Sequence, residues 1–247
     1  MSRWKAAGLH SLISIVIATL VGSLIYFVWY PPPYFQIAGG SKLMLLIMGV
    51  DVVVGPVLTL AVFKSGKKGL RFDLTVIALL QAVSFSYGAS VIARARPVFV
   101  VGEVDRFVVV SANALDDKDL AEAKQSEFST RSWTGPRLVG AMPPALNAQG
   151  YAVAMSALAG KDIDRMPKFY VPYDQVSKTL LAHSHPLADA MQKSSQAGEL
   201  VQDFLRKHGG EVGAYRSLPL RGRFDSFTMV VSASTGQPIA ALPIDPW

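Results

Sequence analysis

The chain has 247 residues, of which 51% are hydrophobic and only 17% charged, and its mean hydropathy of +0.32 is high for a water-soluble protein. It contains no cysteine, which excludes disulfides, thiolate nucleophiles and cysteine-ligated metals. Residues 1–96 hold nine Lys or Arg against two acids, whereas residues 97–247 hold fifteen against sixteen, so the second part has no basic surface for nucleic acid and we expect no nucleic-acid partner.

Three apolar runs dominate the first part of the chain, at residues 9–30, 43–63 and 74–93. Each has about the 20 residues that a helix needs to cross a bilayer. No run of similar length follows Arg96. The sequence therefore predicts a membrane domain of three helices over residues 1–96. It also predicts a mixed α+β domain over residues 97–247, which is long enough to form its own core.

Positive charge beside the apolar runs predicts their orientation. Six basic side chains lie at the amino terminus and in the 64–71 loop, against three on the opposite side. Because basic residues concentrate in cytoplasmic loops, we expect a cytoplasmic amino terminus and a 97–247 domain outside, in the periplasm of a Gram-negative cell. The first run is longer than a signal-peptide core and is followed by Pro31-Pro32-Pro33 instead of small residues, which favours a retained anchor.

Asp51 lies in the middle of the second apolar run, with Gly55 and Pro56 shortly after it. An acid at a helix centre costs roughly 2.5–3.5 kcal/mol on insertion scales, so we expect Asp51 to face the other helices. Depth matching places it level with Gly22 and Ser23 and nearest to Ser84 and Ser86, with Gln81 about a turn away. Two interpretations stay open: a hydrogen-bonded contact between the three helices, or a docking point for a partner helix with a cationic or polar group. The candidate site is Asp51, Gly55, Pro56 and Gln81.

The second part of the chain mixes strand and helix patterns. Residues 96–112 predict one or two strands broken near Gly102, and residues 115–128 predict a helix with acids in its first turn. Further helical segments are expected at 145–158, 173–182 and 186–208. Two or three strands follow residue 212, with 234–237 as a hairpin turn. We expect the opening and closing strands to pair in an antiparallel sheet around the helical insertion.

Patterns for catalysis or metal binding are weak in this sequence. His183 and His185 have a spacing that binds a metal on a strand or loop, but no third ligand follows, which favours two exposed loop histidines. Glu103 and Asp105 would share one face of a strand as a carboxylate pair, although a solvated strand face is the commoner case. Nucleophile-elbow, zinc-protease and phosphate-loop motifs are absent from the sequence. We therefore expect no enzyme, no cofactor and no metal.

Four long strings cover the membrane region and both ends of the second domain: residues 3–35, 49–81, 95–107 and 235–247. Together they resemble the TfpX/TfpZ family of type IV pilin accessory proteins. The resemblance implies an inner-membrane protein that supports pilin stability, or the assembly and retraction of the pilus. It implies the major pilin or inner-membrane assembly proteins as partners, besides the lipid bilayer, and it supplies no catalytic residues.

Two other classes of protein stay open at this stage. A sensor with an exported ligand-binding domain would need an output module, and only short cytoplasmic segments are predicted. A membrane-bound enzyme that modifies pilin or envelope polymers would need a buried acid/base pair facing a cleft. An apolar groove or an exposed sheet edge would instead favour binding of a protein.

Overall fold

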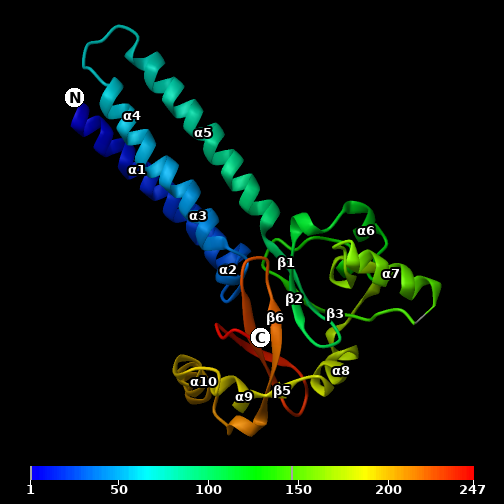
Figure 1. The fold of residues 1–247 in the computed structure, drawn as a ribbon. Coiled ribbons are helices and arrows are strands. Elements are labelled where there is room, and N and C mark those ends of the chain that lie inside the picture. Colours follow the sequence, from blue (N-terminus) through cyan, green and yellow to red (C-terminus); the bar gives the residue numbers. More distant parts are fainter. Residues whose placement is uncertain (1, 146) are drawn as a thin grey trace.

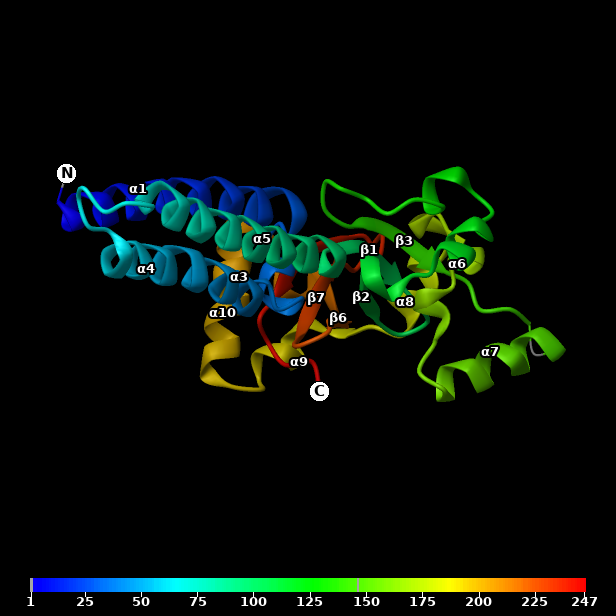
Figure 2. The same cartoon turned by 90° about the horizontal axis from the view of Figure 1, so that it is seen from above.

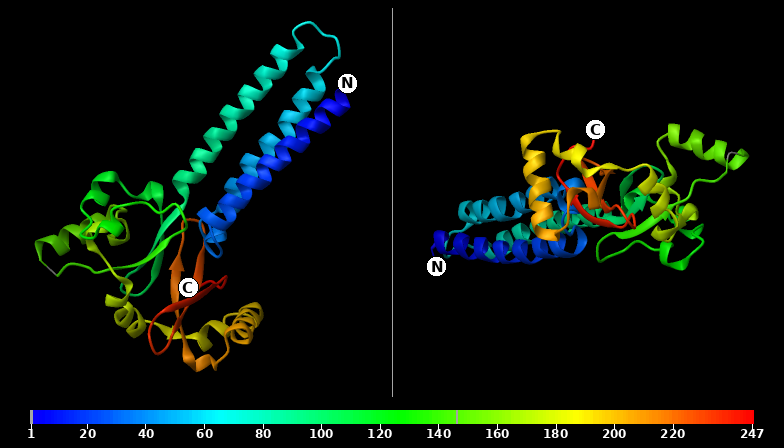
Figure 3. Two further views of the ribbon diagram at one scale, coloured as in Figure 1. Left: turned by 180° about the vertical axis from the view of Figure 1, so that it is seen from behind. Right: turned by 90° about the horizontal axis from the view of Figure 1, so that it is seen from below.

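A computed structural model describes residues 2–145 and 147–247 of the chain. The chain divides into a long helical arm, residues 3–95, and a sheet domain, residues 96–247 (Figure 1). The arm projects from one side of the domain in every view (Figure 3). The chain changes from helix to sheet between Ala95 and Pro97.

The arm consists of helices that run to the domain, away from it and back again (Figure 1). Its elements are α1 (Arg3–Leu24), a π-helical turn (Ile25–Trp29), α2 (Tyr34–Ile37), α3 (Gly40–Gly49), a second π-helical turn (Val50–Val54), α4 (Gly55–Val62) and α5 (Leu70–Ala95). Helices α1 and α4 pack side by side, and α5 contacts α3 and α4 before it leads into the first strand.

The prediction of three membrane-spanning helices is wrong. Among the described residues, only Arg3–Trp29 and α5 are long and apolar enough to cross a membrane, with mean hydropathies of 2.3 and 1.8. The run predicted at 43–63 is divided by the π-helical turn into α3 and α4, of ten and eight residues. Pro56 lacks the N–H that a regular helix would use at this point. The two long helices expose apolar side chains, such as Leu80 at 60%, and are compatible with a membrane anchor.

The described residues of the domain form one mixed sheet of eight strands. Its strands are β1 (Pro97–Gly102), β2 (Phe107–Ser111), β3 (Arg137–Ala141), β4 (Tyr170–Val171), β5 (His185–Pro186), β6 (Tyr215–Arg221), β7 (Ser226–Ser232) and β8 (Pro238–Leu242). The order is β4-β3-β1-β2-β6-β7-β8, and β5 pairs with β6. The hairpin turn predicted at 234–237 joins β7 to β8 as expected.

The prediction of an antiparallel sheet is also wrong, because β1 pairs with β3 in parallel and β2 pairs with β6 in parallel. The opening and closing strands do pair, as expected, through β2 and β6. More than a hundred residues separate these two strands. A connection of that length permits either direction, whereas a tight hairpin permits only the antiparallel one.

Helices lie on both sides of the sheet and at its ends (Figures 1 and 2). They are α6 (Asp117–Ala121), α7 (Ala148–Leu158), α8 (Ser177–Ala182), α9 (Leu187–Met191) and α10 (Ser195–His208). Short 3-10 turns cover Ala112–Ala114, Ser126–Phe128, Ile163–Arg165, Pro167–Phe169, Tyr173–Gln175 and Val212–Ala214. The helix expected at 115–128 is thus reduced to α6 and one 3-10 turn, and the helix expected at 186–208 is split in two.

Buried side chains pack against both faces of the sheet. One cluster contains Phe99 and Val108 with Ile163 and Tyr170, and another contains Phe107 and Leu220 with residues of α8. A smaller cluster joins α9 and α10 to β7 and β8. The alternation along β1 and β2 supplies both faces, since neighbouring residues of a strand point to opposite sides.

The arm is fixed to the domain at two places. At the first place, the rings of Trp29 and Trp133 lie 5.9 Å apart between their centres, and the Arg96 guanidinium lies 3.6 Å from the centre of the same Trp133 ring. At the second place, the β6–β7 turn reaches α2, where the Phe224 N–H donates to the Ile37 carbonyl at 3.4 Å. The part of the sheet around β1 and the part around β6 and β7 are therefore attached to different segments of the arm.

Candidate functional site in the helical arm

A groove between α1 and α5 contains two of the four predicted site residues, Asp51 and Gln81. Its volume is about 310 Å³, and Asp51 of the second π-helical turn lies among its lining residues. The walls are His10, Ile13, Ser14, Ile17 and Ala18 of α1 and Ala78, Gln81, Ala82, Phe85 and Ser86 of α5, with Met48 beside Asp51. Most of these side chains are apolar or small. Small residues let helices approach closely, and a groove of this kind can accept another helix.

Asp51 is buried, with 8% of its surface exposed. Neither of its carboxyl oxygens has a hydrogen-bond partner within the described residues. Leaving a buried polar group unsatisfied costs about 1–3 kcal/mol, and more when the group is charged. The arm therefore holds a strong hydrogen-bond acceptor that its own described side chains do not use.

Gln81 contacts the backbone of Asp51 and not its carboxyl group. Its Nε2 donates to the Asp51 carbonyl at 3.2 Å. In a π-helical register this carbonyl would bond the N–H five residues later, which is the position of Pro56. Since proline has no N–H, the carbonyl is free, and Gln81 supplies the missing donor. Gln81 was expected a turn away from Asp51, and this placement corrects that expectation.

Gly55 allows this contact to form. A Cβ atom added at Gly55 would lie 1.9 Å from Gln81 Nε2, which is far inside contact distance. Any larger residue would displace the end of the Gln81 side chain from the Asp51 carbonyl. The structure therefore brings together Asp51, Gly55 and Gln81, with Pro56 buried on the same segment.

A second polar contact joins α1 to α4 near the groove. The His10 Nδ1 lies 2.6 Å from the Thr59 Oγ1, and the Thr59 side chain is buried. Gly22 contacts Met44 and Met48 instead, so the expected level of Asp51 on α1 is corrected by one to two turns, to Ala18 and Ser14. His10 and Thr59 were missed by sequence reasoning. The available signal was a histidine in the first apolar run and a threonine in the second.

The other predicted candidates do not form a site. Strand β1 ends at Gly102, so Glu103 and Asp105 lie in a turn and not on one strand face. Asp105 forms an ion pair with Arg106, whereas Glu103 is buried. His183 ends α8 and His185 lies on β5, both exposed. Within residues 2–145 and 147–247, no three His, Asp or Glu side chains are placed to hold a metal.

Glu103 instead lies near Asp164, an acid that the sequence analysis did not single out. Both are buried, and one carboxyl oxygen of each has no hydrogen-bond partner among the described residues. Burial, assisted by the negative charges of Asp164 and Asp162, raises the pKa of Glu103 to about 8. Burial also raises the pKa of Asp164. Sixty residues of sequence separate the two acids, so no local pattern could have indicated this pair.

The fold and the groove define a class of proteins in which a mixed sheet is carried on apolar helices that are compatible with a membrane anchor. Residues 1–39 match the family described as fimbrial assembly protein FimB. The chain is 36% identical over 193 residues to a fimbrial assembly protein of serogroup I from Dichelobacter nodosus, which covers 76% of this chain and 74% of the relative.

Further relatives in the same organism agree with this match. The serogroup E1 fimbrial assembly protein is 35% identical over the same shares of both chains. The protein of serogroups C1 and C2 is 40% identical over 122 residues, which is 48% of this chain and 92% of the relative. No solved structure matches the chain. The chain belongs to the fimbrial assembly protein family.

Proposed function

We propose that the chain is a non-enzymatic accessory protein for the biogenesis of type IV fimbriae, of the kind represented by the TfpX/TfpZ family. The observation that carries this proposal is the 36% identity, over three quarters of the chain, to a protein named for fimbrial assembly. The absence of catalytic motifs from the sequence agrees with a binding role. In this proposal the protein works without a cofactor, by contact with the subunits or machinery of the fimbria.

The proposed location is the bacterial inner membrane, with α1 and α5 as the membrane anchor. Both helices end at the domain, and the start of α1 lies at the far end of the arm (Figure 1). The start of α1 and the 64–71 loop are both basic and lie at that far end, which supports a cytoplasmic position for it. The domain would then be periplasmic, on the side where fimbriae grow.

The proposed binding site for a partner is the groove that contains Asp51. Its occupant would be an apolar helix of the major pilin or of an inner-membrane assembly protein, with a cationic or hydrogen-bond-donating group at the level of Asp51. Such a group would satisfy the unpaired carboxyl oxygens in surroundings where an unpaired acid is costly. A second contact by the domain would strengthen binding through effective concentration.

Deletion of the gene in its native host tests the accessory role. The deleted strain is complemented with the wild type, with Asp51→Leu, or with Asp73→Asn, a control at the far end of the arm whose side chain pairs with Lys67. We expect surface fimbriae to be lost on deletion, restored by wild type and control, and reduced at least fivefold by Asp51→Leu at equal protein level.

The outcomes separate the two parts of the proposal. Unchanged fimbriae in the deleted strain would contradict the accessory role. Full restoration by Asp51→Leu, with loss on deletion, would remove the groove from the mechanism and leave the accessory role standing.

A further inference from the structure

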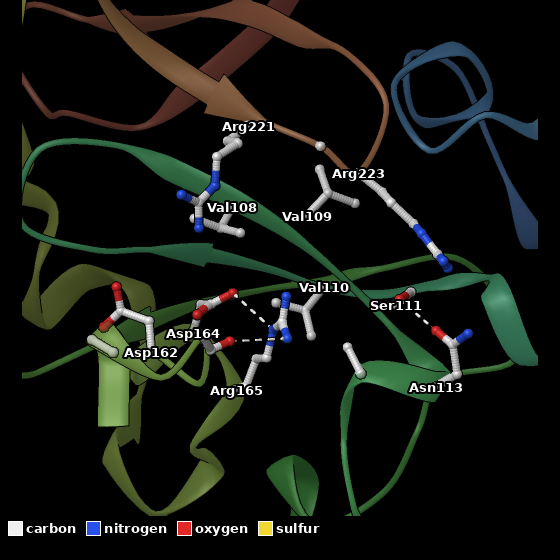
Figure 4. Close-up of a pocket in the computed structure, with 14 residues that line it drawn as sticks. Val108, Val109, Val110, Ser111, Asn113, Asp162, Asp164, Arg165, Arg221 and Arg223 are labelled. Carbon is white, nitrogen blue, oxygen red and sulfur yellow. Dashed lines mark hydrogen bonds and ion pairs between the residues drawn. The ribbon is translucent and has the colours of Figure 1, made fainter. Parts of the chain in front are cut away.

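The sheet opens between β2 and β6, although the two strands are neighbours. Their pairing covers only Phe107 with Leu220 and Val108 with Arg221. Beyond Val108, β2 continues to Ser111 beside a cleft of about 610 Å³ (Figure 4). This volume is within the range of about 300–1,000 Å³ that is usual for ligand sites. Among the described residues, the edge of β2 that borders the cleft therefore has no neighbouring strand.

The cause of the opening is the position of the β6–β7 turn. At Gly222 the chain passes so close to α2 that a Cβ there would lie 2.4 Å from the Ile37 carbonyl oxygen. The next residues are held by the bond from the Phe224 N–H to the same carbonyl. Meanwhile β2 stays paired with β1, which follows directly from α5. Each wall of the cleft is thus held in place by a different helix of the arm.

The pairing of β2 with β1 determines the side to which each residue of β2 directs its backbone N–H and C=O groups. The Glu103 N–H donates to the Arg106 carbonyl at 2.9 Å, and the Ala112 N–H donates to the Arg96 carbonyl at 2.9 Å. Because bonded pairs alternate along an antiparallel ladder, Val108 and Val110 direct their backbone groups to β1. Val109 and Ser111 then direct theirs away from β1: the pairing of Val108 with Arg221 uses the Val109 N–H, while the Val109 carbonyl and both backbone groups of Ser111 face the cleft. Apart from strand pairing, no backbone hydrogen bond of the described residues uses Val109 or Ser111.

The charged side chains of the cleft are distributed unevenly between its two walls. Arg221 and Arg223 project from the β6 side, and Asp162, Asp164 and Arg165 come from the segment on the opposite side (Figure 4). Arg165 lies 3.9 Å from Asp164, and Asp162 accepts from the Ile163 N–H. No ion pair among the described residues uses Arg221 or Arg223. The β6 wall is therefore positively charged, while on the opposite wall Asp164 pairs with Arg165 through one carboxyl oxygen and has no hydrogen-bond partner among the described residues at the other.

We propose that this cleft binds a short extended segment of a partner protein, which adds as a strand to the edge of β2 and places acidic side chains against Arg221 and Arg223. Main-chain hydrogen bonds supply affinity in strand addition, and alternate side chains supply specificity. Arg221 and Arg223 are two residues apart, which favours acidic residues at alternate positions of the segment. This site lies in the domain and goes beyond the proposed role of the arm.

The test uses the full chain in mild detergent and a fluorescent peptide, Ser-Glu-Val-Glu-Val-Glu with blocked ends. Two matched peptides have lysine in place of glutamate, or N-methyl groups on alternate backbone nitrogens. Two variants are compared with wild type: Arg221→Glu/Arg223→Glu, and Arg206→Glu as a control on exposed α10. Fluorescence anisotropy gives the affinity, and hydrogen exchange reports on residues 107–112.

We expect the glutamate peptide to bind wild type and the Arg206→Glu control alike, and to protect residues 107–112 from exchange. The double substitution and the N-methylated peptide should each weaken binding at least tenfold, and the lysine peptide should not bind. Equal binding of the N-methylated peptide would overturn strand addition. Equal weakening by Arg206→Glu would mean that the effect comes from the overall charge of the protein, and this result would overturn the site. Absence of binding at millimolar peptide would overturn the proposal altogether.

Discussion

The arm and the domain place their apolar side chains in opposite ways. The domain buries them against two faces of a sheet, so Leu180 and Leu220 are fully covered. The arm leaves them outward and turns small and polar residues inward: Ser14, Ala18, Asp51 and Thr59 are buried while Leu80 and Val83 are exposed. Burial of apolar surface stabilises a domain in water. The inverted pattern is typical of helices surrounded by lipid.

The arm and the domain also differ in the feature at which we expect a partner to bind. In the arm, the feature that invites a partner is an unpaired acid in an apolar groove. In the domain, it is an unpaired strand edge beside two arginines. The first feature requires a helix with a donor group, and the second an extended chain with acids. Two different parts of one partner, or two partners, can satisfy them.

The largest expected difference in stability is between two leucine-to-alanine variants, one in the domain and one in the arm. Leu180→Ala in α8 should lower the free energy of unfolding by about 2–5 kcal/mol, because it leaves a cavity in the domain core. Leu80→Ala on the outer face of α5 should change it by less than about 0.5 kcal/mol, because its side chain is 60% exposed. Denaturant unfolding of both variants in detergent measures this. Equal costs would mean that the arm has a conventional core.

A glycine substitution in the arm should have the next largest effect. Gly55→Val should lower the stability by about 1–3 kcal/mol, because the added atoms collide with Gln81. Gly49→Val is the matched control, since a Cβ there meets nothing within 4 Å. Thermal unfolding in detergent compares the two. Part of the loss should return when Gln81→Ala is added to Gly55→Val, and equal effects of the two valines would contradict the close contact.

The stability of the domain should depend on pH through one buried acid, Glu103. Burial raises the pKa of Glu103 from 4.5 to about 8, so the folded protein retains a proton that the unfolded chain releases. Stability should therefore fall as pH rises from about 4.5 to 8, by up to about 1.4 kcal/mol per pH unit. Glu103→Gln should flatten this slope in denaturant unfolding at pH 5 and 8.

The control for this prediction is Asp105, which lies two residues away. Its hydrogen bonds with Arg106 lower the pKa of Asp105, so its contribution is lost as pH falls, with the opposite sign. Asp105→Asn should leave the slope between pH 5 and 8 unchanged. An unchanged slope in Glu103→Gln would contradict the raised pKa of Glu103, and a flattened slope in Asp105→Asn would assign the slope to Asp105 instead.

The smallest expected effect concerns the bond between Gln81 and the Asp51 carbonyl. Gln81→Leu removes the donor and should cost about 0.6 kcal/mol, the average for such bonds between membrane helices. Gln81→Glu keeps the size and removes the amide donor, so it should cost at least as much. Thermal unfolding in detergent measures both. A stabilising effect of Gln81→Leu would mean that the carbonyl has another donor in the folded arm.

Local patterns in the sequence predicted local structure well. The two strands around Gly102, the helix ending at Leu158 and the terminal strands are present, because alternation and turn residues act over a few positions. The direction of pairing was not predictable in the same way. Strand β3 lies parallel to β1 through contacts between distant segments, which no pattern within either strand encodes.

The candidate site was predicted in part. An acid in an apolar run is conspicuous in a sequence, so Asp51 could be singled out, and Gly55 and Pro56 followed from their positions. The π-helical turn that divides the run was not foreseen, because the effect of Pro56 on the turn before it depends on Gln81, which comes from another helix. The pair formed by Glu103 and Asp164 likewise depends on the fold alone.

The most direct test of the groove is photo-crosslinking in the native host. A benzoyl-phenylalanine at Ile17 would face the groove, and one at the neighbouring Val16, of similar exposure, would not. We predict that Ile17 yields an adduct with the major pilin or an inner-membrane protein of fimbrial assembly, and that Val16 does not. Equal adducts at both positions, or none at Ile17 with the protein present at normal level, would contradict a partner helix in the groove.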